Sequence, residues 1–455
     1  MMSSEFDQSL EATPWKSVGT IPSNEQFQKL YNSDERVRTM AGYGFYKIDQ
    51  IIKEERPDVL IVSQDIWACA PLTARSYWNK FPCIIWTTLD SLPIHEKALE
   101  SCLKCSPGNF WVWSNFAEKD MKKNGYENVK TVHSLFNTSE FFPLLKVKKE
   151  MLRKRFNIPL DAWICGDTCR NQLRKTLPAL IEGYAMFKSQ NPEVKNPRLL
   201  IHTCFSEGWN IMQLAKDYKV PAEEVLTTYI CSKCHGYEVK AFKGERQDCS
   251  LCQAKQSQNT TSPKQGVTNQ ELNEIYNLMD ILVVARTSGG SEFPIYEFKL
   301  TEGITLITDY SFGEEATEEG SGSLVLDWTS YRDLTQNSFI KAATHPKSVA
   351  KQISNVYRMT PEERKKLGKV GREWAINGYS IDVVGKQIDQ HLSSLLLTSY
   401  NFDFQERKPN PDATIPEIEN DAEWLKVMYK DILAMPVDEN DKGLAGWLEK
   451  LNKIQ

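Results

Sequence analysis

Two short segments of this chain carry residues whose types and spacing suit the binding of a phosphate. In the first, Gly289 and Gly290 follow an apolar run at 281–285 and precede an expected helix that carries Glu297. A glycine turn at the start of a helix offers unpaired backbone N–H groups and the positive end of the helix dipole. A plain helix cap gives the same pattern, so the turn alone leaves both interpretations open.

The second segment is rich in cationic side chains. Arg170 and Lys175 follow an apolar run at 163–165 and precede an expected helix over 176–187. Arginine offers a planar fork of donors and lysine a compact charge, a combination suited to a diphosphate. A solvated basic turn is the alternative. Both segments are expected at the carboxyl ends of strands in one sheet, which favours a shared site.

Four cysteines form a pattern typical of a metal site. Two residues separate Cys231 from Cys234, and two separate Cys249 from Cys252, with a short segment between the pairs that can form a hairpin. Four sulfurs in tetrahedral geometry select zinc, and a closed site of this kind is structural. Several cations lie nearby: Lys233, Lys240, Lys243 and Arg246. Zinc that braces a loop is the expected role, and nucleic-acid binding is the alternative.

Short apolar runs must place these residues. Runs with the character of buried strands recur along the chain at 58–63, 83–86, 110–113, 129–132, 163–165, 199–201, 281–285 and 305–307. Helical stretches such as 45–55 and 115–124 lie between them. This alternation predicts doubly wound α/β domains, whose ligands gather at the carboxyl ends of the strands. Two such series predict two Rossmann-like domains that face a cleft, at 1–150 and 151–380.

These motifs resemble the retaining family-four glycosyltransferases, which have the GT-B fold. That family has an Arg and a Lys five positions apart after the first strand of the second domain, as Arg170 and Lys175 are here. Its second signature has two glutamates eight positions apart. Glu297 matches the second glutamate, whereas Gly289 stands at the first position and Glu292 is the nearby substitute. The likeness spans roughly residues 40–395.

The resemblance implies that a sugar is transferred from a nucleotide diphosphate sugar to an acceptor hydroxyl, with retention. Arg170 and Lys175 would neutralise the diphosphate leaving group, and Glu297 would hold the ribose hydroxyls. Glu292 would contact the sugar together with the turn at Gly289 and Gly290. The sequence contains no Asp-x-Asp motif, and no catalytic metal is expected.

The first domain would carry the acceptor. Gly42 and Gly44 resemble the glycine loop that approaches the donor diphosphate, although a simple turn explains them equally well. Asp90 follows a strand and is expected either to bind a sugar or acceptor hydroxyl or to cap the next helix. Asp65 and Trp67 end another strand. Trp67 is expected to stack on an acceptor or to be an ordinary aromatic of the core or rim.

Other segments complete the predicted organisation. The cysteine pairs are expected to interrupt the second domain as an insertion at 228–256. A crossover helix at 381–400 is expected to return to the first domain. A linker follows at 401–420, and apolar residues at helical spacing predict a small helical appendage at 421–455.

The composition sets limits on location and partners. Hydrophobic residues make up 41% of the chain and charged residues 25%, which excludes wholesale disorder. The net charge of −5 gives no global attraction to nucleic acid or to an anionic membrane. No apolar run is long enough for a transmembrane helix, and 11 cysteines with metal-type spacing suit a reducing cytoplasm.

We therefore expect a cytoplasmic, nucleotide-sugar-dependent glycosyltransferase with a structural Zn²⁺ and an unidentified acceptor. One alternative is a DNA-modifying glycosyltransferase that acts on a hydroxymethylated base. A second alternative is a non-catalytic interaction protein that kept the GT-B fold, which the glycine at position 289 motivates.

Overall fold

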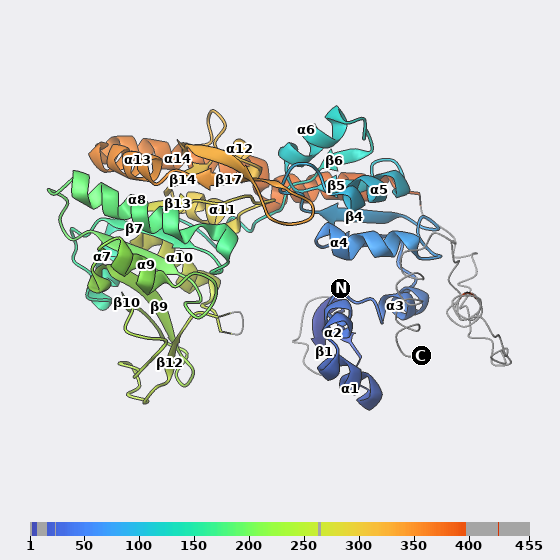
Figure 1. Cartoon of the computed structure of the whole chain (residues 1–455), viewed down its shortest axis with the longest axis horizontal. Coiled ribbons are helices and arrows are strands. Elements are labelled where there is room, and N and C mark those ends of the chain that lie inside the picture. The colour runs from blue at the N-terminus through green and yellow to red at the C-terminus, as the bar shows by residue number, and fades with distance from the viewer. Residues whose placement is uncertain (1, 7–15, 23, 263–264, 397–425, 427–455) are drawn as a thin grey trace, which may run out of the picture. The chain divides into compact units, whose positions relative to one another are not determined.

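The computed structural model describes residues 2–6, 16–22, 24–262, 265–396 and 426. Its elements are labelled in Figure 1. The predicted linker at 401–420 and, apart from Lys426, the predicted appendage at 421–455 lie outside the described residues.

The first parallel sheet lies in the N-terminal part of the chain. Its strands follow one another in the order β3, β4, β5 and β6, with bounds Leu60–Ser63, Cys83–Thr87, Phe110–Val112 and Val129–Thr131. The helices between them are α4 (Ile66–Cys69), α5 (Glu96–Lys104) and α6 (Asn115–Lys123). Each strand coincides with a predicted apolar run to within a few residues.

The second sheet contains the parallel order β9-β8-β7-β13-β14-β15. The bounds of these strands, in chain order from β7, are Ile164–Thr168, Arg198–His202, Val225–Cys231, Ile281–Val284, Ile304–Thr308 and Ser323–Leu326. Numbered along the chain, this is the 3-2-1-4-5-6 order of the Rossmann fold. The order reverses between β7 and β13, and at such a point the loops leave in opposite directions and open a crevice.

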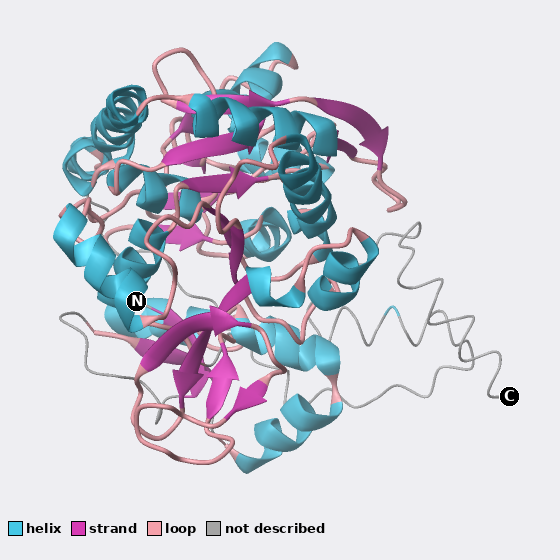
Figure 2. Ribbon diagram, turned by 90° about the vertical axis from the view of Figure 1, so that its left-hand side faces the viewer, coloured by secondary structure: helices cyan, strands magenta, loops and turns pink. Residues whose placement is uncertain are grey.

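Helices cover both faces of this sheet, because side chains alternate between its faces. Ile281 and Val283 of β13 pack with α8 (Leu177–Gln190), α9 (Ile211–Asp217) and α13 (Pro346–Arg358). Leu282 and Val284 face the other way. They join a cluster with α7 (Lys146–Arg155), α10 (Asn269–Leu278), α11 (Phe293–Leu300) and α14 (Pro361–Tyr379). Figure 2 shows strands with helices on either side, as expected of a doubly wound sheet.

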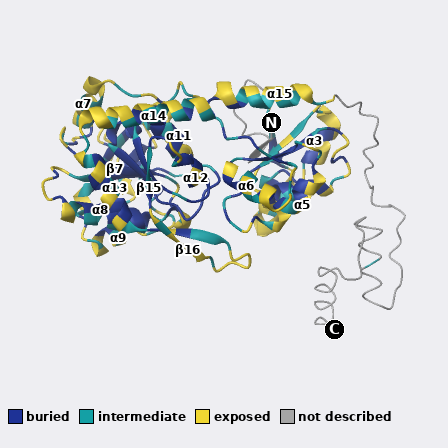
Figure 3. Ribbon diagram, turned by 90° about the horizontal axis from the view of Figure 1, so that it is seen from above, coloured by how far each residue is buried: buried dark blue, intermediate teal, exposed yellow. Residues whose placement is uncertain are grey.

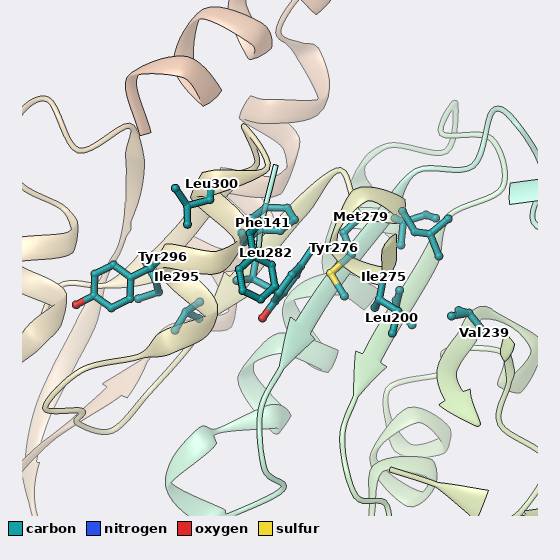
Figure 4. Close-up of a cluster of buried hydrophobic side chains, with 14 of the residues drawn as sticks. Phe141, Leu200, Val239, Ile275, Tyr276, Met279, Leu282, Ile295, Tyr296 and Leu300 are labelled. Atoms are coloured by element: carbon teal, nitrogen blue, oxygen red, sulfur yellow. The ribbon is translucent and has the colours of Figure 1, made fainter. Parts of the chain in front are cut away.

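The hydrophobic cluster on the α10 side illustrates how the sheet is fixed. Leu200 lies on β8 and Leu282 on β13, the strands on either side of β7. Both belong to a cluster with Ile275 and Tyr276 of α10 and Ile295 of α11 (Figure 4). In Figure 3, β7 has the colour of buried residues, whereas α8, α9 and α14 carry exposed residues. Burial of this apolar surface is the main force that holds the loops at the strand ends in place.

Additional strands extend the second sheet beyond β9. Strand β10 (Tyr237–Ala241) and strand β12 (Gln258–Thr260) both pair with β9 in antiparallel fashion, and β11 (Arg246–Gln247) pairs with β12. The predicted insertion falls in this region. A separate hairpin, β16 (Trp328–Arg332) and β17 (Ile340–Thr344), follows β15 and has no counterpart among the predicted elements.

Smaller elements lie near both ends of the described chain. The N-terminal elements are β1 (Met2–Phe6), β2 (Val18–Ile21), α1 (Glu25–Ser33), α2 (Glu35–Gly42) and α3 (Ile48–Glu55). After α14, a π-helical turn (Ile381–Gly385) leads into α15 (Lys386–Ser394), whose His391 Nε2 lies 2.9 Å from Asn109 Oδ1 beside the first sheet. Among the residues that the structure describes, none of the helices has the length and apolar character needed to cross a bilayer.

Candidate functional site

Two loops meet beyond the carboxyl ends of β7 and β13, where the strand order reverses. The short 3-10 helix η3 (Leu173–Lys175) follows β7, and the glycine-containing loop 285–292 follows β13. The loops hold each other, because the Thr287 backbone N–H donates to the Arg174 carbonyl at 3.0 Å. In open α/β sheets this is the place where ligands bind.

A buried network of four charged side chains joins these loops. The Arg286 guanidinium donates two hydrogen bonds to Asp167, each 2.8 Å long, and its Nε donates to Glu292 at 3.1 Å. The Lys175 ammonium donates to both oxygens of Glu292, at 2.6 and 2.7 Å. None of the four residues exposes more than 7% of its surface. Two carboxylates thus balance two cations inside the protein, as buried charges require.

Glu292 is held as an anion in this network. Burial by itself raises the pKa of a carboxyl group, but the neighbouring charges of Arg286 and Lys175 outweigh burial and hold the pKa of Glu292 below its ordinary value. The carboxylate therefore persists at neutral pH and fixes the position of the Lys175 ammonium.

Asp167 and Arg286 are members of this network that sequence reasoning did not assign. Asp167 belongs to β7 and Arg286 lies just beyond β13, and these strands are neighbours in the sheet. Opposite charges near the carboxyl ends of two expected strands were a usable signal. The pairing of these two charges can be predicted only when β7 and β13 are known to be neighbours, which a single sequence does not show.

Arg170 lies in the same loop as Lys175 but has a different environment. Its guanidinium forms a two-pronged ion pair with Glu207, at 2.8 and 3.1 Å, and its side chain is 57% exposed. The structure thus joins Lys175 to Glu292, whereas the hydrogen bonds of the Arg170 side chain go to Glu207.

The glycines at 289 and 290 permit close approaches that a side chain would block. A Cβ atom on Gly289 would lie 2.8 Å from Glu292 Oε1, and one on Gly290 would lie 2.1 Å from Thr88 Oγ1. Gly290 therefore packs against the loop that follows β4 of the first sheet. Ser288, two residues before Gly290, donates a 3.1 Å hydrogen bond to Asp90 of that same loop.

Glu297 lies in α11, behind this loop. Its carboxyl accepts a 2.6 Å hydrogen bond from the Tyr276 hydroxyl. Burial raises the pKa of Glu297 to about 7, and the hydrogen bond from Tyr276 opposes that rise only in part. The charge of Glu297 therefore changes in the neutral pH range.

The predicted glycines of the first domain lie at the end of α2. Gly42 is the last residue of that helix, and Gly44 follows with a positive φ of 81°. The Gly44 carbonyl accepts hydrogen bonds from the backbones of Lys47 and Ile48. The segment is a turn that leads from α2 towards α3.

Asp90 lines a cavity together with the other acceptor candidates. Asp65, which precedes α4, and Trp67, within α4 rather than at the end of β3 as predicted, lie in the wall of a cavity of about 160 Å³, with Asp90 and His95. Phe339, from the loop of the β16–β17 hairpin, completes the lining. The three first-domain residues singled out in the sequence are therefore brought together.

The four cysteines form a compact cluster. Their sulfur atoms all lie within 4.8 Å of one another. Sγ of Cys231 is 3.7 Å from Sγ of Cys252, and Sγ of Cys234 is 3.8 Å from Sγ of Cys249. Four sulfurs around a zinc ion, each at about 2.3 Å, have edges of roughly 3.8 Å. The cluster could hold a metal ion, and its geometry fits a tetrahedral one.

Comparisons with known proteins rest on the fold. No family model matches the sequence, and no curated protein sequence matches it. The chain is similar in structure to a sucrose-phosphate synthase from Thermosynechococcus elongatus, with a TM-score of 0.57 and 13% identity over 86% of this chain and 88% of that one. It is also similar to a glycosyltransferase from Rickettsia africae, with a TM-score of 0.53 and 13% identity over 83% and 89%.

A third similar structure is HepE from Anabaena in complex with UDP-glucose. The TM-score is 0.54, with 12% identity over 82% of this chain and 90% of that chain. At these identities the likeness concerns the fold. The predicted α/β architecture with two Rossmann-like domains, the GT-B fold, is confirmed, and the four-cysteine cluster is part of it.

Proposed function

We propose that this protein is a glycosyltransferase that moves a sugar from a nucleotide diphosphate sugar to an acceptor hydroxyl, with retention of anomeric configuration. The observation that carries the proposal is the pair of cationic and glycine loops at the switch point of the second sheet. Structures of similar fold include a complex with UDP-glucose, which supports a uridine nucleotide as the first donor to test.

We assign the donor roles to residues of this switch point. Lys175 and Arg170 would bind the diphosphate, and the turn at Gly289 and Gly290 with Glu292 would contact the sugar. Glu297 would accept hydrogen bonds from the ribose hydroxyls. Negative charge grows on the diphosphate as the glycosidic bond breaks, so fixed cations stabilise the transition state more than the ground state.

The two cations are expected to contribute unequally. Lys175 is buried and held in place by Glu292, so little ordering is needed when a diphosphate arrives. A diphosphate must compete with a carboxylate at both cations, with Glu292 at Lys175 and with Glu207 at Arg170, but the exposed Arg170 side chain must also be ordered. Lys175 therefore carries the larger share of diphosphate binding.

The metal is proposed to be structural zinc. The sulfur geometry fits a tetrahedral ion, and backbone N–H groups of Lys233 and Cys252 point to Cys231 Sγ and Cys249 Sγ, which favours thiolates. When bound, zinc supplies cross-links between β9 and the segment before β12. Lys240 and Lys255 nearby are paired with Glu238 and Asp248, which favours bracing over nucleic-acid binding.

The decisive experiment measures donor binding and transfer. UDP, GDP and ADP, each free and as the glucose conjugate, are titrated into the protein by calorimetry, and product anomers are assigned by NMR. Lys175→Ala should weaken binding of the preferred nucleotide by about 10- to 100-fold, the value of a charge-assisted hydrogen bond. A product with inverted anomeric configuration would disprove retention and would leave the proposed transferase activity standing.

A matched control separates this effect from general loss of an ion pair. Lys188 on α8 pairs with Glu224, and its side chain is 23% exposed against 9% for Lys175. Lys188→Ala removes a lysine of similar setting away from the two loops, and nucleotide affinity should not change. Equal losses in both variants, or nucleotide binding by neither the variants nor the native protein, would exclude the proposed donor site.

A further inference from the structure

The β16–β17 hairpin reaches the first sheet at the acceptor cavity. The Ile340 backbone N–H donates to the Leu92 carbonyl at 2.6 Å, and the Tyr310 hydroxyl donates to the Ile340 carbonyl at 2.6 Å. Phe339, the residue before Ile340, forms part of the cavity wall opposite His95, with ring centroids 6.1 Å apart. One wall of the cavity is therefore built by the second half of the chain.

Lys341 of the hairpin also orients the Asp90 carboxylate in that cavity through two serine hydroxyls. The Lys341 ammonium donates to Ser91 Oγ at 2.6 Å and to Ser288 Oγ at 2.8 Å. Those two hydroxyls donate in turn to the two oxygens of Asp90, at 2.9 and 3.1 Å. Lys341 thus leaves each serine proton free for Asp90 and orients its carboxylate from both sides.

The rest of the lining presents complementary chemistry. Trp67 is 37% exposed, and its indole forms a T-shaped contact with the Tyr43 ring, with ring centroids 4.6 Å apart. His95 Nδ1 accepts a hydrogen bond from the Lys97 backbone, so the neutral ring carries its proton on Nε2 as a donor. Asp65 adds a second carboxylate. The cavity therefore combines the indole of Trp67 with carboxylate acceptors and one imidazole donor. This combination suits a sugar ring, whose C–H groups give it an apolar face and whose hydroxyls surround it.

We infer that this cavity binds one ring of a saccharide acceptor, and that the β16–β17 hairpin completes the site through Phe339 and Lys341. The inference rests on the proposed function. At about 160 Å³ the cavity is smaller than the roughly 300–1,000 Å³ of pockets for drug-sized ligands, so it suits a single ring. Two carboxylates in the lining repel phosphates, which disfavours a nucleic-acid acceptor.

The test measures saccharide binding separately from donor binding. Glucose, galactose, mannose, N-acetylglucosamine and maltose are probed by saturation-transfer NMR on the full chain, with and without saturating UDP. A DNA duplex that contains hydroxymethylcytosine serves as the competing acceptor. At least one saccharide should bind, and Trp67→Ala and Phe339→Ala should each weaken it by about tenfold.

Variants of the hairpin test the positioning role of Lys341. Lys341→Met should raise the KM for the saccharide acceptor and leave the UDP affinity unchanged, and Lys341→Arg should restore much of the loss. Leu334→Ala, at a fully exposed position in the hairpin loop, is the matched control and should change neither quantity. Thermal unfolding of each variant shows whether the hairpin is still folded.

The outcomes separate the two proposals. UDP binding without any saccharide binding, or saccharide binding that none of Trp67, Phe339 and Lys341 affects, would overturn this inference and leave the donor site intact. Binding of the modified duplex in preference to the sugars would overturn it as well. Saccharide binding without nucleotide binding would support the cavity and refute the proposed transferase.

Discussion

Replacement of Glu292 by glutamine tests the charge balance of the candidate site. The change keeps the shape of the side chain and removes one buried negative charge. Arg286 retains its two hydrogen bonds to Asp167, whereas Lys175 loses the carboxylate that both of its short hydrogen bonds reach. The variant therefore leaves one uncompensated cation in a buried position.

The magnitude follows from the cost of an unpaired buried charge. Removal of one partner from a buried ion pair destabilises a protein by about 3–5 kcal/mol. The amide oxygen of glutamine still accepts one hydrogen bond from Lys175, so we expect Glu292→Gln to lower the free energy of unfolding by about 3 kcal/mol at pH 7.

Acidification should remove the same contribution from the native protein. The folded-state pKa of Glu292 is lower than its unfolded value, so its stabilisation is present above about pH 4.3 and is lost as the pH falls through the folded-state pKa. The difference in stability between Glu292→Gln and the native protein should therefore shrink below that pH.

Urea unfolding, followed by tryptophan fluorescence with and without UDP, provides the assay. Glu207→Gln is the control, because its partner Arg170 is 57% exposed and such pairs contribute less than about 1 kcal/mol. A diphosphate can replace the missing charge beside Lys175, so UDP should stabilise Glu292→Gln more than the native protein. Equal stability losses in the two variants would refute the assignment of Glu292 as the counter-charge of Lys175.

Three further predictions concern other parts of the protein. UDP-glucose affinity should increase as the pH rises through about 7, because ionised Glu297 accepts ribose hydroxyls better, and calorimetry of Glu297→Gln should show no such rise. Cys231→Ser should abolish the zinc measured by mass spectrometry of metals, whereas Cys102→Ser, outside the cluster, should retain it. Gly290→Ala should lower the free energy of unfolding by about 1–3 kcal/mol through its clash with Thr88, and Thr88→Gly should recover part of that loss in urea unfolding.

Parallel strands such as β13 and β4 were predictable because each is a short apolar run that is almost wholly buried. The run at 281–285 became β13 (Ile281–Val284), and the run at 83–86 became β4 (Cys83–Thr87). Strand β9 was missed, although all of Val225–Cys231 is buried, because its two threonines and tyrosine interrupt the apolar pattern. The hairpin formed by β16 and β17 was missed for a related reason. Strand β16 is largely exposed and carries no apolar periodicity.

The candidate site was predictable in its parts and not in its pairings. Arg170 and Lys175 stand at the expected interval, yet η3 turns the chain between them, so that Lys175 is buried and Arg170 is exposed. The cysteine cluster was the exception, because two short knuckles fix their own geometry locally. The donor loops depend instead on which strands become neighbours.

The pairing of β7 with β13 explains why Glu292 contacts Lys175, which the position of Glu292 in the sequence does not show. The carboxylate lies beyond β13 and the ammonium of Lys175 beyond β7, and only the pairing of these strands places them 2.6 Å apart. A carboxylate fixed by two cations keeps few lone pairs for a sugar hydroxyl. A donor whose diphosphate binds Lys175 would free part of the Glu292 carboxylate for other hydrogen bonds. Glu292 can therefore hold the cation before the donor binds and accept a sugar hydroxyl afterwards, and one residue serves both needs in turn.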